Sequence, residues 1–218
     1  MPSASSVLRP GLRTFKPRRS RITPRQRRAL QDRSYPLVTT DELRSAWPAD
    51  RPVIVDIGFG SADPVVALAS TFPEQTILAI DVHTPGVGDL VDRCRADSIG
   101  NVLVVEADAL DLLADLPHKA AGFRSFFPDP WPKVRHHKRR LVQPAVVDAI
   151  FDHLIAGGFW HIATDWAQYA DSIVELFAND ERWSGGIIER PVWRPTTHFE
   201  RRASRDGREV FDMWFERT

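Results

Sequence analysis

The sequence is short of cysteine and of long hydrophobic runs, and each shortage excludes a class of protein. Cys94 is the only cysteine among 218 residues, so an intramolecular disulfide, a CxxC zinc site and a dithiol redox centre are all excluded. No stretch approaches the roughly 20 consecutive apolar residues that span a bilayer, and the basic N-terminus lacks the apolar segment of a secretory signal. We therefore expect a cytoplasmic protein in a reducing compartment, with Cys94 packed as a small hydrophobe.

Net charge is also absent, but the charges are segregated along the chain. Residues 1–35 hold ten basic residues against one acid, Asp32, and residues 133–140 hold five basic residues and no acid. The remaining residues carry 14 basic and 28 acidic side chains. This segregation indicates a polyanionic partner held by two basic segments, and the alternative is a basic tail with a solvated charge run.

The apolar pattern predicts an α/β fold. Short runs rich in Val, Ile, Leu and Phe predict buried parallel strands at 52–58, 76–81, 101–108, 120–129 and 157–165. Amphipathic segments between them predict helices at roughly 63–72, 86–98, 109–116, 142–156 and 166–179, with Gly157 and Gly158 as a helix stop. Segments 185–193 and 208–217 predict an antiparallel pair at the edge of a doubly wound sheet. We expect a mobile basic arm without regular structure at 1–35 and one domain at 36–218.

A carboxylate stands at or just beyond the end of each of the five predicted parallel strands. These residues are Asp56, Asp81, Asp108 (with Glu106), Asp129 and Asp165. In an open α/β sheet the ligand binds in the crevice at the carboxyl ends of the strands. Aspartate is also a common turn and helix-cap residue, but five in register favour an acid-lined crevice.

The first carboxylate begins a glycine-rich turn, DIGFGSAD, in which Gly58 and Gly60 let the backbone approach a ligand closely. Asp63 stands where a dinucleotide-binding turn needs a small residue, and its charge would repel a phosphate. S-adenosylmethionine has no phosphate and offers a ribose diol, ammonium and amine donors and a sulfonium. Asp81 suits the diol, as it would in NAD, and Asp108 suits the adenine amine.

The segment FFPDPWPKVRHHKRRLVQP follows the fourth strand and combines three features. Asp129 is held between prolines, Trp131 offers a face on which a base could stack, and a cationic run suitable for phosphate contacts follows. That run includes Lys133, Arg135, Lys138, Arg139 and Arg140. The pattern predicts a site for a flipped-out base on an anionic backbone, or, alternatively, a rigid loop before a helix with an exposed basic face.

Two further segments are less specific. His136 and His137 are adjacent and have no other His or Cys at ligand spacing, so we expect no metal. RPTTHFERR, between the last two strands, is expected to form a loop over the mouth of the sheet, where Thr196, Thr197 and Glu200 contact substrate or cofactor, or else a plain surface turn.

The segments VDIGFGSAD, AIDVHTPGV, EADAL, FFPDPWPKVRHHKRRLVQP, IATDWAQYA and RPTTHFERR resemble, in order and spacing, those of the bacterial tRNA (guanine-N7-)-methyltransferase family. TFKPRRSRITPRQRRAL resembles that family's N-terminal segment, so the resemblance covers nearly the whole chain. It implies a Rossmann-like methyltransferase sheet. It also implies methyl transfer from S-adenosylmethionine to N7 of a guanine in the variable loop of tRNA, which is position 46 in conventional tRNA numbering.

The resemblance also implies roles by position. The implied cofactor contacts are Asp56, Gly58, Gly60, Asp81, Asp108 and Asp129, and Asp129 is also the implied catalytic residue. The implied tRNA contacts are Lys133, Arg135, His136, His137, Lys138, Arg139, Arg140, Asp165, Thr197, His198, Phe199 and Glu200. The family usually has Glu at positions 56 and 81, Gly at 62 and 203, and Lys at 198, where this chain has Asp56, Asp81, Ala62, Ala203 and His198.

Two other functions compete with this interpretation. One is a non-catalytic RNA-binding protein on the same scaffold, and the other is a nicotinamide-dependent oxidoreductase, against which Asp63 and the missing phosphate fingerprint argue. The expected partner is tRNA, with no membrane and no obligatory protein partner, and both a monomer and a homodimer remain open.

Overall fold

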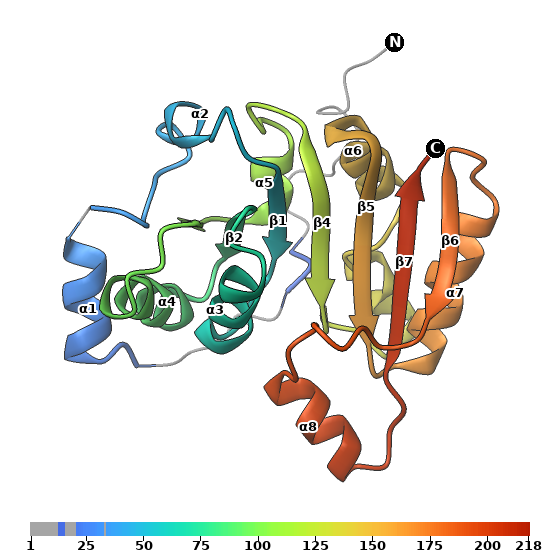
Figure 1. Cartoon of the computed structure of the whole chain (residues 1–218). Coiled ribbons are helices and arrows are strands. Elements are labelled where there is room, and N and C mark those ends of the chain that lie inside the picture. Colours follow the sequence, from blue (N-terminus) through green and yellow to red (C-terminus); the bar gives the residue numbers. More distant parts are fainter. Residues whose placement is uncertain (1–12, 16–20, 33) are drawn as a thin grey trace.

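All the strands belong to one seven-stranded sheet. The computed structural model describes residues 13–15, 21–32 and 34–218. The order is β3-β2-β1-β4-β5-β7-β6, in which β3, β2, β1, β4 and β5 are parallel and β7 is antiparallel to both β5 and β6 (Figure 1). The strands are β1 (Val53–Ile57), β2 (Thr76–Asp81), β3 (Val102–Glu106), β4 (Ala120–Phe126), β5 (Leu154–Thr164), β6 (Trp183–Ile188) and β7 (Phe211–Arg217). The mostly parallel sheet with an antiparallel C-terminal pair is confirmed.

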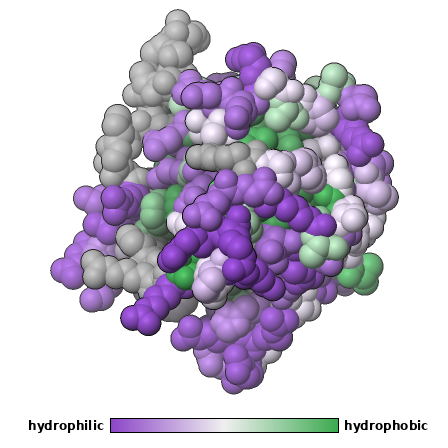
Figure 2. Space-filling model, turned by 90° about the vertical axis from the view of Figure 1, so that its left-hand side faces the viewer, coloured by the Kyte–Doolittle hydropathy of each residue, from purple (hydrophilic) through white to green (hydrophobic). Residues whose placement is uncertain are grey.

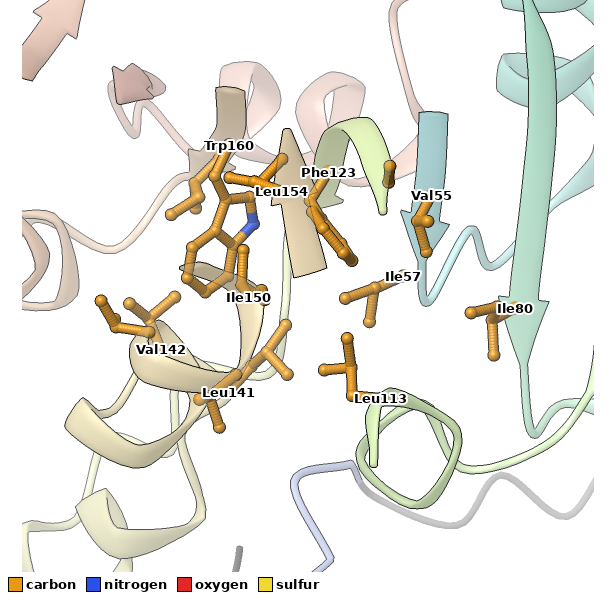
Figure 3. Packing of buried hydrophobic residues seen from close by; sticks show 14 of the residues in the cluster. Val55, Ile57, Ile80, Leu113, Phe123, Leu141, Val142, Ile150, Leu154 and Trp160 are labelled. Atoms are coloured by element: carbon orange, nitrogen blue, oxygen red, sulfur yellow. The ribbon is translucent and has the colours of Figure 1, made fainter. Parts of the chain in front are cut away.

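Helices cover both faces of the sheet because its central strands are apolar on both faces. Every residue of β1 and β2 is buried, including Asp56 and Asp81. Helices α3 (Ala62–Thr71) and α4 (Thr84–Ala96) pack on one face, and α5 (Ala109–Leu113), α6 (Pro144–His153) and α7 (Ala167–Ala178) pack on the other. Figure 3 shows the second of these layers, where Ile150 and Leu141 face Phe123, Trp160 and Ile57.

Several predicted boundaries differ from the structure by a few residues, and two of these differences lie next to the antiparallel part of the sheet. The helix expected to reach residue 156 ends at His153, and β5 begins at once at Leu154. Gly157, with φ +71°, lies inside β5 at a register shift against β4 and does not stop a helix. The strand expected over 185–193 is β6, which ends at Ile188, because Pro191 removes a backbone donor from the segment beyond it.

The basic arm contains a helix that the sequence analysis did not expect. In α1 (Pro24–Gln31), Thr23 caps the N-terminus by accepting a hydrogen bond from Gln26 N at 3.3 Å, and Pro24 occupies the first turn. The expectation of no regular structure is therefore wrong for residues 24–31. Residues 1–12, 16–20 and 33 of the arm lie outside the described residues.

Helix α1 is fixed to α4 by close packing and by charge. Arg25 forms ion pairs with Asp89 at 2.5 Å and Asp92 at 3.3 Å. Arg95 of α4 donates hydrogen bonds to Ala29 O within α1 and to Asp32 O and Ser34 O just beyond it. On this side of the molecule hydrophilic side chains dominate the surface (Figure 2).

Three short elements complete the fold. They are α2 (Leu43–Ala46), the 3-10 helix η2 (Val134–Arg139) and α8 (His198–Arg205). Cys94 is buried in α4, as predicted, and burial raises the pKa of its thiol to about 12. In the part of the chain that the structure describes, no helix has the length and apolar character needed to cross a bilayer.

Gly88 offers a test of how α1 is held. A Cβ added there would lie 2.9 Å from the Cβ and 3.0 Å from the carbonyl oxygen of Gln26, so α1 has to move away. We expect Gly88→Ala to speed hydrogen exchange of the α1 amides at least about fivefold, which corresponds to an overpacking cost of about 1 kcal/mol. Gly100→Ala is the control, because nothing lies within 4 Å of the added atom. Equal protection of α1 in both variants would contradict the packing argument.

Candidate active site

A cavity of about 230 Å³ opens at the carboxyl ends of β1 to β4, where the sequence analysis placed the ligand. Its floor comes from the ends of these strands and the turns that follow them. Among the described residues that line the cavity, three are acidic and none is Lys or Arg. The lining residues are Thr14, Phe15, Ile57, Gly58, Gly60, Ile80, Asp81, Val82, His83, Ala107, Asp108, Ala109, Phe127, Pro128, Asp129, Leu141 and Phe199.

Asp81 shapes the turn after β1. Its Oδ2 accepts a hydrogen bond from Gly60 N at 2.7 Å, and its Oδ1 accepts one from His83 N at 2.8 Å. Gly58 and Gly60 have φ of +71° and +69°, a left-handed conformation that glycine adopts without strain. One carboxylate thus joins the glycine turn to the start of α4, and the remaining lone pairs of its oxygens can accept from a ligand.

Asp108 and Asp129 complete the acidic lining. Asp108 caps α5 by accepting from Leu110 N at 3.0 Å, and burial raises the pKa of its carboxyl, partly opposed by Arg13 of the arm. Asp129 lies half-buried in the turn after β4. Asp81, Asp108 and Asp129 therefore meet in one cavity, as the sequence predicted.

Asp56 does not line this cavity, so the prediction of one crevice for all five aspartates is wrong for this residue. It is only 2% exposed and lies opposite Arg124 on the neighbouring strand, β4. Burial raises the pKa of Asp56 to about 7, against the opposing effect of Arg124 and together with the effect of Asp81. Asp56 lines a small void of about 20 Å³ together with Thr197 and is absent from the lining of the larger cavity.

Asp165 is the second exception. Its Oδ2 accepts a hydrogen bond from Arg208 Nε at 3.0 Å, and it is absent from the cavity lining. The ion pair ties the end of β5 to the loop before β7. Three of the five carboxylates therefore lie in the cavity, because Asp56 is buried within β1 and Asp165 follows β5, which lies further along the sheet.

The turn after β4 is strained and tied down at its start. Phe127 and Trp131 have φ of +56° and +44°, which non-glycine residues rarely adopt. Phe127 N donates to Ala163 O of β5 at 2.7 Å, and the Phe127 ring stacks on that of Phe199 at 6.1 Å with an interplanar angle of 21°. Asp129 thus lies in the turn between Phe127 and Trp131, two aromatic residues with a left-handed backbone conformation.

Trp131 is buried, so its ring is not open for base stacking in this structure. It is 6% exposed, Arg139 lies over the ring at 5.1 Å, and its Nε1 donates to Thr14 O at 3.0 Å. Through this bond the arm reaches the cavity, and Thr14 and Phe15 form part of the lining. These two residues were not predicted as site residues, because nothing in the sequence of a basic, proline-containing arm indicates where it folds back.

The cationic run after this turn forms η2, most of whose basic side chains face solvent. Lys133, Arg135, Lys138 and Arg139 are exposed, whereas His136 and His137 are half-buried. Arg140 was predicted to contact phosphate, but its side chain is buried, with only 4% of the residue exposed. Its Nε donates to Pro130 O at 2.9 Å, and its guanidinium lies over Tyr169 of α7 at 4.7 Å. Arg140 therefore anchors the loop and does not reach outward.

The expected loop at RPTTHFERR contains a helix, α8. Thr197 caps it by accepting from Glu200 N at 3.1 Å, and the Thr-x-x-Glu spacing is a capping-box signal that the sequence analysis did not use. Phe199 faces the cavity, and His198 is exposed. Thr197 and Glu200 are buried, at 6% and 8% exposed, so they hold the helix and offer no open polar surface.

Glu200 belongs to a buried ion cluster centred on Arg194. Arg194 is 1% exposed, and its two Nη atoms donate to the Glu200 carboxylate at 2.8 and 3.1 Å. Nη2 also donates to Asp212 Oδ2 of β7 at 3.0 Å, and Asp212 Oδ1 lies 2.8 Å from His161 Nε2. Arg190 adds a second cation, donating to Glu200 at 2.8 Å. The cluster fixes α8 to the sheet.

No group of three or more His, Cys, Asp or Glu side chains within residues 13–15, 21–32 and 34–218 is arranged to hold a metal ion.

Comparisons with known proteins agree with this geometry. A family model described as a putative methyltransferase matches residues 50–213. A tRNA (guanine-N(7)-)-methyltransferase from Streptomyces coelicolor is 39% identical over 95% of this chain and 81% of its own length. One of the same name from Alkalilimnicola ehrlichii is 40% identical over 94% of this chain and 92% of its own.

Among solved structures, the 16S rRNA methyltransferase KamB has the same fold, with a TM-score of 0.58 and 17% identity over 82% of this chain and 92% of its own. The extent and level of identity to the curated relatives show that the chain belongs to the tRNA (guanine-N(7)-)-methyltransferase family.

Proposed function

We propose that this protein transfers the methyl group of S-adenosylmethionine to N7 of guanine 46 in the variable loop of tRNA, in the cytoplasm. The observation that carries the proposal is one cavity with three aspartates and no lining Lys or Arg among its described residues, directly beside a turn that continues into the exposed cations of η2. The acidic groups of the cavity and the basic groups of η2 thus form two distinct sets that lie close together in the chain. The first set suits a cationic small molecule, and the second suits a polyanion.

The residues present fit this cofactor. Asp81 lies at the end of β2, where sheets of this type bind a ribose diol, and a carboxylate can accept from both hydroxyls. Asp108 offers an acceptor for an amine, and Phe15, Ile57 and Leu141 give the cavity an apolar wall. A nicotinamide dinucleotide fits less well, because its pyrophosphate would meet acidic residues and no lining cation among the described residues.

S-adenosylmethionine, when bound, supplies an electrophilic methyl group on a sulfonium. Guanine N7 carries an in-plane lone pair and no proton, so the protein does not need to remove one before the transfer. The work of this chain is then alignment of the two reactants, which can lower the barrier by several kcal/mol. Asp129, fixed between prolines and beside the stacked Phe127 and Phe199, orients the base or the cofactor and stabilises the positive charge on the methylated base.

The direct test uses purified protein, labelled methyl donor and an unmodified tRNA transcript. We expect label in the tRNA, and cleavage specific for 7-methylguanosine should map it to position 46. A transcript with adenosine at that position is the matched control and should remain unlabelled. Label at another nucleotide would contradict the assigned position, and absence of label would contradict the activity.

Asp129→Asn tests the proposed catalytic residue. We expect the single-turnover rate at saturating cofactor and tRNA to fall at least tenfold, about 1.4 kcal/mol, because the variant loses the charge that faces the reacting groups. Asp115→Asn is the control, since Asp115 is exposed and absent from the cavity lining. A loss of less than tenfold in Asp129→Asn would contradict the role.

Phe15→Ala tests whether the arm contributes to the cofactor site. The ring forms part of the cavity wall, and removing a partly buried aromatic side chain costs about 1–2 kcal/mol of apolar contact. We therefore expect calorimetry to give an S-adenosylmethionine affinity about 5- to 30-fold weaker. Tyr35→Ala removes an aromatic ring remote from the cavity and should leave that affinity unchanged. Equal affinities in wild type and Phe15→Ala would remove the arm from the cofactor site.

Replacing Lys133, Arg135 and Lys138 together by Gln tests the role of η2. These exposed cations would release counterions from tRNA phosphates, so the variant should bind tRNA more weakly and with a shallower dependence on salt, while cofactor affinity stays the same. A tRNA titration at several salt concentrations measures both quantities. An unchanged salt dependence would exclude η2 from the interface.

A further inference from the structure

We infer that α8 is a third tRNA-contacting element, whose exposed arginines Arg201, Arg202 and Arg205 bind the phosphate backbone beside the cavity. This inference rests on the proposed function, because it takes tRNA as the substrate. The residues at 197–200, to which the family resemblance gives tRNA contacts, lie at the start of α8. The arginines follow these residues and face the opposite way, toward solvent.

The position of α8 places its arginines near the reacting groups. The helix lies beyond the carboxyl ends of β4 and β5, at the same end of the sheet as the cavity (Figure 1). Its second residue, Phe199, lines the cavity and stacks on Phe127. Arg205 follows Phe199 by six residues, and at 1.5 Å per residue these two positions lie roughly 9 Å apart along the helix axis. A guanine presented to a cofactor in the cavity would therefore have neighbouring phosphates within reach of α8.

The two faces of α8 differ sharply in charge. Glu200 and Ala203 face the protein, at 8% and 0% exposed, whereas Arg201, Arg202 and Arg205 are exposed. The Glu200 charge is already balanced by Arg190 and Arg194 inside the protein, so it does not neutralise the outer face. Asp206 is the only other acid between residues 198 and 206; it lies 3.0 Å from Arg208 and 3.8 Å from Arg202. An excess of positive charge therefore faces solvent.

An exposed basic helix face can be simply solvated, but the anchoring of α8 favours a binding role. Arg194 joins Glu200 of α8 to Asp212 of β7, and its guanidinium lies 5.9 Å from the ring of Phe127 at the start of the Asp129 turn. Buried charges are costly unless each one has a charged or hydrogen-bonding partner. The partners of Arg194 therefore hold α8 in one orientation relative to β7. Arginines presented on a preordered helix lose less conformational freedom on binding a phosphate than the same residues on a loose segment.

The experiment compares three forms of the full chain with one unmodified tRNA transcript. The first is wild type, and the second has Arg201→Gln, Arg202→Gln and Arg205→Gln. The third is a charge-matched control with Arg44→Gln, Arg51→Gln and Lys119→Gln, which lie before or at the amino ends of β1 and β4, at the far end of the strands from α8. Glutamine keeps helix propensity close to that of arginine, so α8 should remain folded, as circular dichroism can verify.

We expect the α8 variant to bind tRNA about tenfold more weakly at 0.15 M salt, roughly the physiological ionic strength. The slope of log K against log salt should be shallower by about 2, because each lost phosphate contact contributes about 0.7 to 0.9. The control should keep the wild-type slope, and both variants should bind S-adenosylmethionine as wild type does. A wild-type slope in the α8 variant, or an equal loss in the control, would overturn the inference.

The outcomes for α8 and for the proposed function remain separate. If wild type binds tRNA but transfers no methyl group, the proposed activity fails, and the salt dependence still decides the role of α8. If wild type methylates guanine 46 and the α8 variant keeps full affinity and slope, the activity stands and the role of α8 is wrong. If wild type does not bind tRNA, both proposals are overturned.

Discussion

The buried guanidinium of Arg194 is the interaction on which the substrate side of this molecule depends. It lies between the carboxylates of Glu200 and Asp212, and so joins α8 to β7. The same group lies near the rings of Phe126 and Phe127, where β4 enters the Asp129 turn. Without this cation, Glu200 would keep only Arg190 and Asp212 only His161 as charged or polar side-chain partners, and removing one partner from a buried ion cluster costs several kcal/mol. The relative position of α8 and the Asp129 turn is therefore set by charge pairing in the protein interior, in addition to apolar packing.

A different carboxylate organises the cofactor side. Asp81 accepts hydrogen bonds from the backbone of Gly60 and His83, and thereby joins the turn after β1 to the start of α4. Helix α4 in turn carries α1, through Gly88 and the ion pairs of Arg25. The arm is thus fixed at one point by α1 and at another by the bond between Trp131 and Thr14, which leaves Phe15 in the wall of the cavity. The cofactor side and the basic arm are parts of one connected arrangement.

The sequence predicted the sheet well because its central strands are short apolar runs between turn residues, as in 53–57 and 76–81. It also predicted that Asp81, Asp108 and Asp129 meet, since parallel strands end at one edge. What it could not supply is how far each side chain reaches across that edge. Asp56 and Asp165 have the same sequence signature as the other three, yet Asp56 is buried opposite Arg124 and Asp165 pairs with Arg208, both distant in the chain. Likewise, Arg140 reads as one more cation in a basic run, and only its contact with Tyr169 of α7 shows that it is structural. The capping signals of α1 and α8 were present at Thr23 and Thr197, but basic, polar segments mask them.

The balance of charge follows from these assignments. A methyl donor that carries positive charge and an RNA that carries negative charge have to be held within a few ångströms of each other, so their binding groups must be separated and must not neutralise one another. In this chain the cavity acids are shielded by backbone donors, as at Asp81. The internal arginines Arg140 and Arg194 donate to interior acceptors, and Arg124 is enclosed against the rings of Phe72 and Trp193. The cations left at the surface, on η2 and α8, then flank the cavity mouth without lining it. The net charge of zero therefore conceals a local separation between an acidic cavity and a basic rim, and the distinction between paired and exposed arginines defines where that rim lies.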